Sequence, residues 1–292
     1  MLAKLSTFLR SFLSFFLKKT TQTEQSEITD NVLKLKEQSE LTNDKMIAKC
    51  EIHVLYCSKM GCSEEEYEDA FYLPFTKSPN DISNCKVAIA DGATESSFAK
   101  EWANILAKGF AKYSFENGEI QNSLKELRQL WRSSINTANL PWYAQDKFQK
   151  GAFSAFLGVE IDFGKKLWKS VAVGDCCLFL VRNDKLIISF PFVDYESFGN
   201  NPYAISSNHS QNLDIDKHLL IKEHDFKQGD ILILASDAIA AWFLKSCSEG
   251  KKTWDIVINR FENEDFETWL NEQRAKKEVK NDDTTLILIE FS

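Results

Sequence analysis

The sequence predicts an α+β fold built on antiparallel sheets. Short apolar runs that are typical of strands are joined by tight turns, as at residues 163–166 and 182–185. The second of these turns contains Asn183 and Asp184, which tolerate the positive φ angles of a hairpin. Helical periodicity is grouped between runs of strands, whereas in a doubly wound parallel sheet a helix follows almost every strand.

The predicted strands and helices begin at about residue 50. Apolar or alternating stretches predict strands at 51–58, 69–75, 85–90, 151–161, 167–173, 177–181, 186–190, 231–236 and 284–291. Apolar residues repeat at three- and four-residue steps from Phe98 to Tyr113, which predicts an amphipathic helix. Residues 191–216 are predicted to form a polar loop, and helical segments are expected between the strand at 231–236 and about Lys280.

A second helix is expected over about 119–137. The side chains expected on its inward face are Leu124, Leu127, Leu130 and Trp131. Five tryptophans, most of them in helix-like segments, are expected to pack in the core or against helices. These are Trp131, Trp142, Trp242, Trp254 and Trp269.

Residues 1–48 differ in composition from the rest of the chain. Residues 1–17 place apolar side chains on one helical stripe, which predicts an amphipathic helix that is too short and too charged to span a bilayer. Two interpretations stay open for it: contact with a membrane surface, or packing against the domain or a partner. Residues 18–48 are polar and lack aromatics, which predicts a linker. We therefore expect one folded domain over 49–292.

Composition excludes several classes of function. The net charge is −8, and no long basic run occurs outside the N-terminus, so a nucleic-acid partner is not expected. The seven cysteines include no C-x-x-C pair, which favours reduced thiols in the cytoplasm over disulfides or a thiolate zinc site. The four histidines lack the H-E-x-x-H spacing, and no phosphate-binding G-x-x-x-x-G-K-[ST] loop is present.

Acidic residues recur at the edges of the predicted strands. They are Glu68-Asp69, Asp91 before Gly92, Asp175 after Gly174, Asp237, and Asp282-Asp283. Each of them, taken singly, is also typical of a turn or a helix N-cap. Carboxylates at several strand ends can converge at one rim of a sheet, and oxygen-only ligands suit Mg²⁺ or Mn²⁺. The joint pattern therefore predicts a site for two divalent cations that can clamp a phosphoryl group.

Five motifs along residues 52–292 resemble those of the metal-dependent Ser/Thr protein phosphatases of the 2C type, in the same order and at approximately the same spacing. By this resemblance the chain looks like a divergent, bacterial-like member of that family. The motifs are S-K-M-G followed by E-D-A-F, V-A-I-A-D-G, G-A-F-S-A-F with V-A-V-G-D-C-C-L-F-L-V-R, D-I-L-I-L-A-S-D-A-I and N-D-D-T-T-L-I-L. The resemblance implies an αββα sandwich, in which two antiparallel sheets pack face to face, helices lie outside, and metals bind in a cleft at one end.

The resemblance also implies a ligand set for two ions, Mn²⁺ or Mg²⁺. Asp91 would bridge both ions, and the carbonyl group of Gly92 would bind one of them. Asp237 and Asp282 would hold the other ion. A water activated by the ions would attack the phosphate, so that no side chain becomes phosphorylated.

Three further acidic residues match positions of the family that act less directly. Asp69 and Glu68 would act mostly through coordinated water. Asp175 resembles the position that binds a third, looser ion in bacterial members.

The sequence departs from the family at three positions. Ala93 stands where some members carry a proton-donating His, and Ala238 replaces a glycine. Glu64 stands where an Arg anchors the substrate phosphate, so small phosphate esters are expected to bind weakly at the entrance of the site.

Two functions therefore stay open. The carboxylates at every metal position favour an enzyme that hydrolyses phosphoserine or phosphothreonine on proteins. The missing Arg and His favour a catalytically weak or dead domain that binds phosphoproteins or regulates a kinase. In either case the expected partner is a phosphorylated protein, a kinase or its target. The expected location is the cytoplasm, at the membrane periphery if residues 1–17 form a surface helix.

Overall fold

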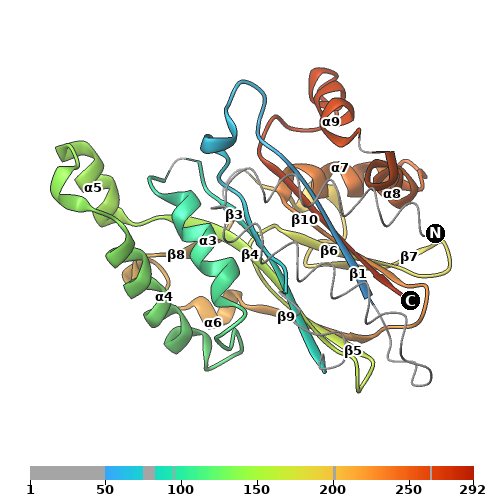
Figure 1. Cartoon of the computed structure of the whole chain (residues 1–292), viewed down its shortest axis with the longest axis horizontal. Helices are drawn as coiled ribbons and strands as arrows, with labels where there is room; N and C mark the ends of the chain where they lie inside the picture. Colours follow the sequence, from blue (N-terminus) through green and yellow to red (C-terminus); the bar gives the residue numbers. More distant parts are fainter. Residues whose placement is uncertain (1–49, 75–82, 95, 200–201, 264) are drawn as a thin grey trace, which may run out of the picture. The chain divides into compact units, whose positions relative to one another are not determined.

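Two antiparallel sheets face each other in the part of the chain that the structure describes (Figure 1). The computed structural model describes residues 50–74, 83–94, 96–199, 202–263 and 265–292. The predicted helix over 1–17 and the predicted linker over 18–48 lie outside these ranges.

Sheet A has five strands and sheet B has six. Sheet A contains, in spatial order, β1 (Cys50–Cys57), β11 (Thr284–Phe291), β10 (Ile231–Ala235), β6 (Cys177–Val181) and β7 (Leu186–Phe190). Sheet B contains β2 (Ala70–Tyr72), β3 (Asn84–Gly92), β4 (Phe153–Asp162), β5 (Leu167–Val173) and β9 (Leu220–Asp225), with β8 (Ile205–Ser206) paired to the start of β4.

Helices cover the outer face of each sheet (Figure 1). On sheet B lie α3 (Ala99–Gly109), α4 (Ile120–Ser134) and α6 (Ile215–His218), and α5 (Trp142–Lys150) extends beyond them, with Phe148 packed on Trp131 of α4. On sheet A lie α7 (Asp237–Ser248), α8 (Thr253–Asn263) and α9 (Phe266–Ala275). Short 3-10 turns are η1 (Glu64–Glu66), η2 (Thr137–Asn139), η3 (Tyr195–Ser197) and η4 (His209–Gln211). Among the described residues, no helix combines the length and the apolar character needed to cross a membrane.

The strands send alternate side chains into two different cores, as a period of two requires. In β4, Phe156 packs with the helices on sheet B, whereas Leu157 packs between the sheets. In β11, Ile287 packs between the sheets and Leu288 packs with the helices on sheet A. The result is a four-layer αββα sandwich, which confirms the predicted α+β fold class.

The hairpin predicted at residues 182–185 is confirmed. Asn183 and Asp184 have φ angles of 51° and 58°, and the Arg182 and Lys185 backbones hydrogen bond to each other across the turn. Two consecutive residues with positive φ match the twist of the flanking strands β6 and β7.

The polar loop predicted over 191–216 is partly wrong, and β9 was not predicted. Within that loop, Ile205 and Ser206 form β8 and are buried. The sequence of β9, L-I-K-E-H-D, lies at the edge of sheet B and is largely exposed, so it lacks the alternation that a half-buried strand shows.

Two predictions of inward-facing side chains are wrong, and α5 was also not predicted. Leu130 is 51% exposed. It lies one residue, or about 100° around the helix, from the buried Trp131. Trp142 is 81% exposed, because it opens α5, a helix without buried residues.

Candidate functional site

The ends of several strands bring the predicted site residues to one rim of the sandwich. In sheet B, Asp91 and Gly92 end β3 opposite the start of β4, and Asp69 immediately precedes β2, which pairs with the same end of β3. In sheet A, Asp237 follows β10 as the first residue of α7, and Asp282 comes two residues before β11.

A side-chain hydrogen bond joins the two sheets at this rim. The hydroxyl group of Thr285 in β11 donates to Oδ2 of Asp69, at 2.7 Å. Thr285 is itself held at the end of β10, because its amide donates to Oγ of Ser236, the residue after that strand, at 2.9 Å. Asp69 therefore has a defined position relative to the residues that come from sheet A.

The carboxylates are close enough to change one another's ionisation. Burial, with the charges of Asp283 and Asp237 in addition, raises the pKa of Asp69 to about 8. Burial, and then the charge of Asp237, raises the pKa of Asp175 to about 7. Burial raises the pKa of Asp91 well above its usual range, and four neighbouring aspartates, led by Asp69, add to this. The aspartates that the sequence predicted as ligands thus form one electrostatic cluster.

The donor set of this cluster fits a hard divalent cation. Oδ1 of Asp69 is buried, with no hydrogen-bond partner among the residues that the structure describes. A buried carboxylate oxygen without a donor is costly, and a cation bound by oxygen ligands relieves that cost. The crowding that raises the pKa values of Asp91 and Asp175 is likewise offset by positive charge.

Glycine is required at two positions of the rim. A Cβ atom on Gly92 would lie 2.7 Å from the carbonyl oxygen of Glu68, so only glycine lets these two loops approach. Gly174, before Asp175, has a φ of +101°, and a Cβ atom there would lie 2.7 Å from Cβ of Ala155. Both glycines therefore place predicted ligands by close backbone packing.

Lys59 and Asp283 lie within the quoted motifs, but the motif comparison gave them no role. Nζ of Lys59 lies 3.2 Å from Oε2 of Glu68 and 3.3 Å from Oγ1 of Thr94. Asp283 accepts hydrogen bonds from the amides of Lys59 at 2.9 Å and Glu68 at 2.7 Å. Asp283 thus ties together the two ends of the segment that connects β1 to β2, and Lys59 brings a positive charge to the rim.

Lys280 and Arg274 hold the loop that carries Asp282. Nζ of Lys280 lies 3.2 Å from Oδ2 of Asp237 and 2.6 Å from Oδ2 of Asp282. The buried guanidinium group of Arg274, on α9, donates to the carbonyl oxygens of Ser58 and Asp282. No sequence motif pointed to either residue, because Asp237 and Ser58 are brought to them by tertiary packing.

The structure places Glu64 at an exposed turn. Glu64 opens η1, and its carbonyl oxygen and that of Glu65 accept hydrogen bonds from Nζ of Lys100, at 3.4 Å and 2.7 Å. Lys100 therefore holds the backbone of η1. Ala93 is exposed after β3, and its amide donates to the carbonyl oxygen of Phe153.

Two other features of the surface contain none of the predicted site residues. Glu51, His53 and Glu290 are the one group of three acidic, His or Cys side chains in the described residues with ligand atoms within 4.8 Å of one another. They lie toward the opposite end of the β1–β11 pair from Asp282. The aspartates of the rim are therefore spread more widely than this group.

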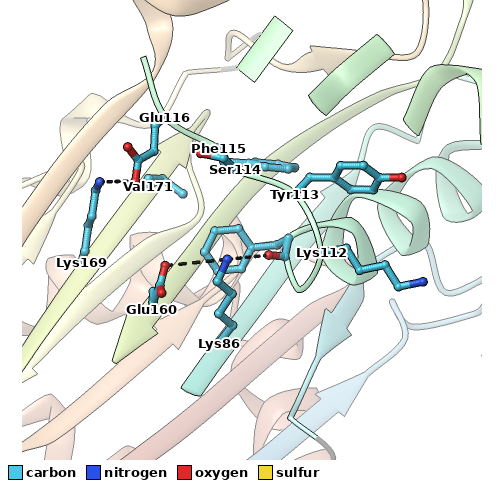
Figure 2. A pocket seen from close by; sticks show the side chains of 10 residues that line it. Lys86, Lys112, Tyr113, Ser114, Phe115, Glu116, Glu160, Lys169 and Val171 are labelled. Carbon is cyan, nitrogen blue, oxygen red and sulfur yellow. Dashed lines mark hydrogen bonds and ion pairs between the residues drawn. The ribbon is translucent and has the colours of Figure 1, made fainter. Parts of the chain in front are cut away.

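The hollow in Figure 2 is the other feature, with a volume of about 270 Å³. It lies over β3, β4 and β5 beside the chain that follows α3. Lys86 points toward Glu160 at 3.7 Å, and Lys169 pairs with Glu116 at 2.6 Å. None of the predicted site residues lines this hollow.

The stability of the metal-free protein is expected to fall as the pH rises from 5.5 to 8. Folded Asp69 and Asp175, with pKa values of about 8 and about 7, keep protons in this range that the unfolded chain has released. Unfolding therefore becomes more favourable with pH. In EDTA, the Tm is expected to drop by roughly 5 °C or more, measured by circular dichroism. Asp69→Asn should reduce the slope, and a flat or rising Tm would contradict the raised pKa values.

Comparison with known proteins shows the fold. No family model and no curated protein matches the sequence. The solved structure of the photosystem II phosphatase PBCP aligns with a TM-score of 0.51 at 14% identity, over 84% of this chain and 99% of that chain. The serine/threonine phosphatase PstP/Ppp of Mycobacterium tuberculosis aligns with a TM-score of 0.51 at 12% identity, over 82% of this chain and 98% of that chain. At these sequence identities, the structural similarity shows a shared fold and nothing further.

Proposed function

We propose that this chain is a metal-dependent phosphatase that hydrolyses phosphoserine or phosphothreonine on proteins. The observation that carries the proposal is the convergence of predicted aspartate ligands at one rim, where Oδ1 of Asp69 is buried without a hydrogen-bond partner among the described residues. The fold that the chain shares with two solved phosphatases supports the same reaction class, by analogy.

The ligands proposed for two Mn²⁺ or Mg²⁺ ions come from both sheets. Asp91 and the carbonyl group of Gly92 belong to β3 of sheet B, and Asp237 and Asp282 lie next to the ends of β10 and β11 of sheet A. Bound ions would activate a water and neutralise the charge of the phosphoryl oxygens. Because the two sheets are joined at this rim through Thr285, the protein itself holds the two halves of the ligand set together.

Three more carboxylates complete the proposed site. Asp69 and Glu68 belong to the segment before β2, and Asp175 belongs to the loop between β5 and β6. We assign Asp69 and Glu68 to hydrogen bonding of coordinated water, and Asp175 to a third, looser ion.

The chain offers positive charge for the substrate from Lys59. Its ammonium group lies beside Glu68 and Thr94, on the side of the rim where Ala93 and Thr94 are exposed. An exposed rim suits a phosphorylated protein segment, which cannot enter a deep pocket. The substrate is therefore proposed to be a phosphoprotein, a kinase or its target, in the cytoplasm. Membrane contact through residues 1–17 remains a proposal about residues outside those described.

A second function is favoured by two residues. Ala93 cannot donate a proton, and the carboxylate of Glu64 cannot grip a phosphate as an Arg does. A domain with these substitutions could bind phosphoproteins or regulate a kinase without turning them over.

Phosphate release from phosphoserine and phosphothreonine peptides by the full chain tests the proposed function. With Mn²⁺ we expect turnover that EDTA abolishes and that re-added Mn²⁺ restores. A double variant, Asp237→Asn with Asp282→Asn, serves as the control for a contaminating phosphatase. Tight binding of the peptides without release of phosphate, under the same conditions, would instead establish the binding module.

A further inference from the structure

The ammonium group of Lys280 lies between two of the proposed metal ligands. Nζ is 3.2 Å from Oδ2 of Asp237 and 2.6 Å from Oδ2 of Asp282. The side chain of Lys280 is 64% exposed, whereas those of Asp237 and Asp282 are 19% and 26% exposed. A flexible cationic side chain therefore reaches in from solvent to two carboxylates that are mostly covered.

The two carboxylates need a positive charge between them. Asp237 opens α7, and Asp282 comes from the loop that follows α9, so their approach depends on tertiary packing. Like charges held this close repel each other strongly where water is partly excluded. Lys280 supplies the opposite charge from within the chain, only two residues from Asp282.

We propose that Lys280 is an internal counter-ion that competes with the divalent cation for Asp237 and Asp282, and so sets the metal affinity of the site. This inference rests on the proposed function, because it takes those two aspartates as metal ligands. A divalent cation and the ammonium group would use the same Oδ2 atoms and repel each other. Binding of the ion therefore requires the ammonium group to leave, and the exposed stem of Lys280 allows it to turn into solvent.

Displacing the ammonium group of Lys280 breaks two charge-assisted contacts, and the free energy of those contacts is subtracted from that of metal binding. Exposed ion pairs are weak and partly covered ones are stronger, so their loss corresponds to about a three- to tenfold change in affinity. The same pairs hold Asp237 and Asp282 in place before an ion arrives, which keeps the rim ordered in the metal-free protein.

Titration of the full chain with Mn²⁺ tests this role without measuring activity. Free Mn²⁺ is followed by electron paramagnetic resonance, and circular dichroism checks the fold of each variant. Lys280→Met is expected to bind Mn²⁺ about three- to tenfold more tightly than the wild type. Lys280→Gln should behave like Lys280→Met, and Lys280→Arg, which keeps the charge, should stay close to the wild type.

A matched control separates this contact from the loss of one positive charge. Lys245 pairs with Glu278 at 3.0 Å, and it has no described contact with the aspartates of the rim. Lys245→Met should leave the Mn²⁺ affinity unchanged. An equal gain in Lys245→Met would show a general effect of charge and overturn the role of Lys280.

The outcomes distinguish this inference from the proposed function. If the wild type binds Mn²⁺ and Lys280→Met binds it equally well or less well, Lys280 is not a competitor, and the metal centre stands. If neither protein binds Mn²⁺, the metal centre and the proposed function fail, and the role of Lys280 fails with them.

Discussion

Replacing Asp91 by Asn is expected to lower phosphate release at least about a hundredfold and to raise the Tm of the metal-free protein. Asp91 is the central ligand of the proposed metal site, and the neutral amide of Asn cannot replace its negative charge. When no ion is bound, the ionisable carboxyl group of Asp91 destabilises the folded protein. Burial and four neighbouring aspartates raise its pKa well above the usual range. Removing this carboxyl group relieves that destabilisation.

The two readouts of Asp91→Asn must change in opposite directions. Phosphate release is measured with saturating Mn²⁺, and the Tm is measured in EDTA. Asp194→Asn is the control, since Asp194 caps the exposed turn η3 through Ser197 and has no described contact with the aspartates of the rim. Full activity in Asp91→Asn after metal removal and re-addition would contradict the two-ion site. A lower Tm in EDTA would show that Asp91 stabilises the fold.

Replacing Lys59 by Met is expected to raise the KM for phosphopeptides by about tenfold or more, with a smaller change in kcat. Hydrogen bonds to charged groups contribute about 1.5–3 kcal/mol, which corresponds to roughly 10- to 150-fold in binding. Lys59 is the lysine that the structure places beside Glu68 and Thr94 at the rim. A loss confined to KM indicates binding of the ground state.

Two comparisons make the test of Lys59 specific. Lys59→Arg should restore most of the affinity, because a guanidinium group also binds phosphate. Lys100→Met is the matched control, since Lys100 holds the backbone carbonyl groups of Glu64 and Glu65. If Lys59→Met leaves KM unchanged while Lys100→Met raises it, the positive charge for the substrate comes from the η1 side of the rim.

Much of the fold could be predicted because local patterns and tertiary packing agree. The run V-A-I-A before Asp91 predicts a buried strand, and it forms the centre of β3. The Asn183-Asp184 turn was predicted from the φ angles that these residues tolerate. By contrast, β9 is a polar edge strand. Its own sequence does not predict a strand, and it is a strand because it pairs with β5.

The sequence by itself determined which groups could bind a cation and where along the strands they stand. Aspartates at strand ends, and the glycines that let the loops approach, are local properties of the motifs. Only the tertiary structure decided which positive charges face these aspartates. Lys280 reaches Asp237 across 43 positions of the chain, Arg274 reaches Ser58 across 216, and Lys59 reaches Thr94 across 35. Such contacts depend on how α9 and the loops pack on the rim, and a long flexible side chain leaves no periodic signal in the sequence that would indicate its partner.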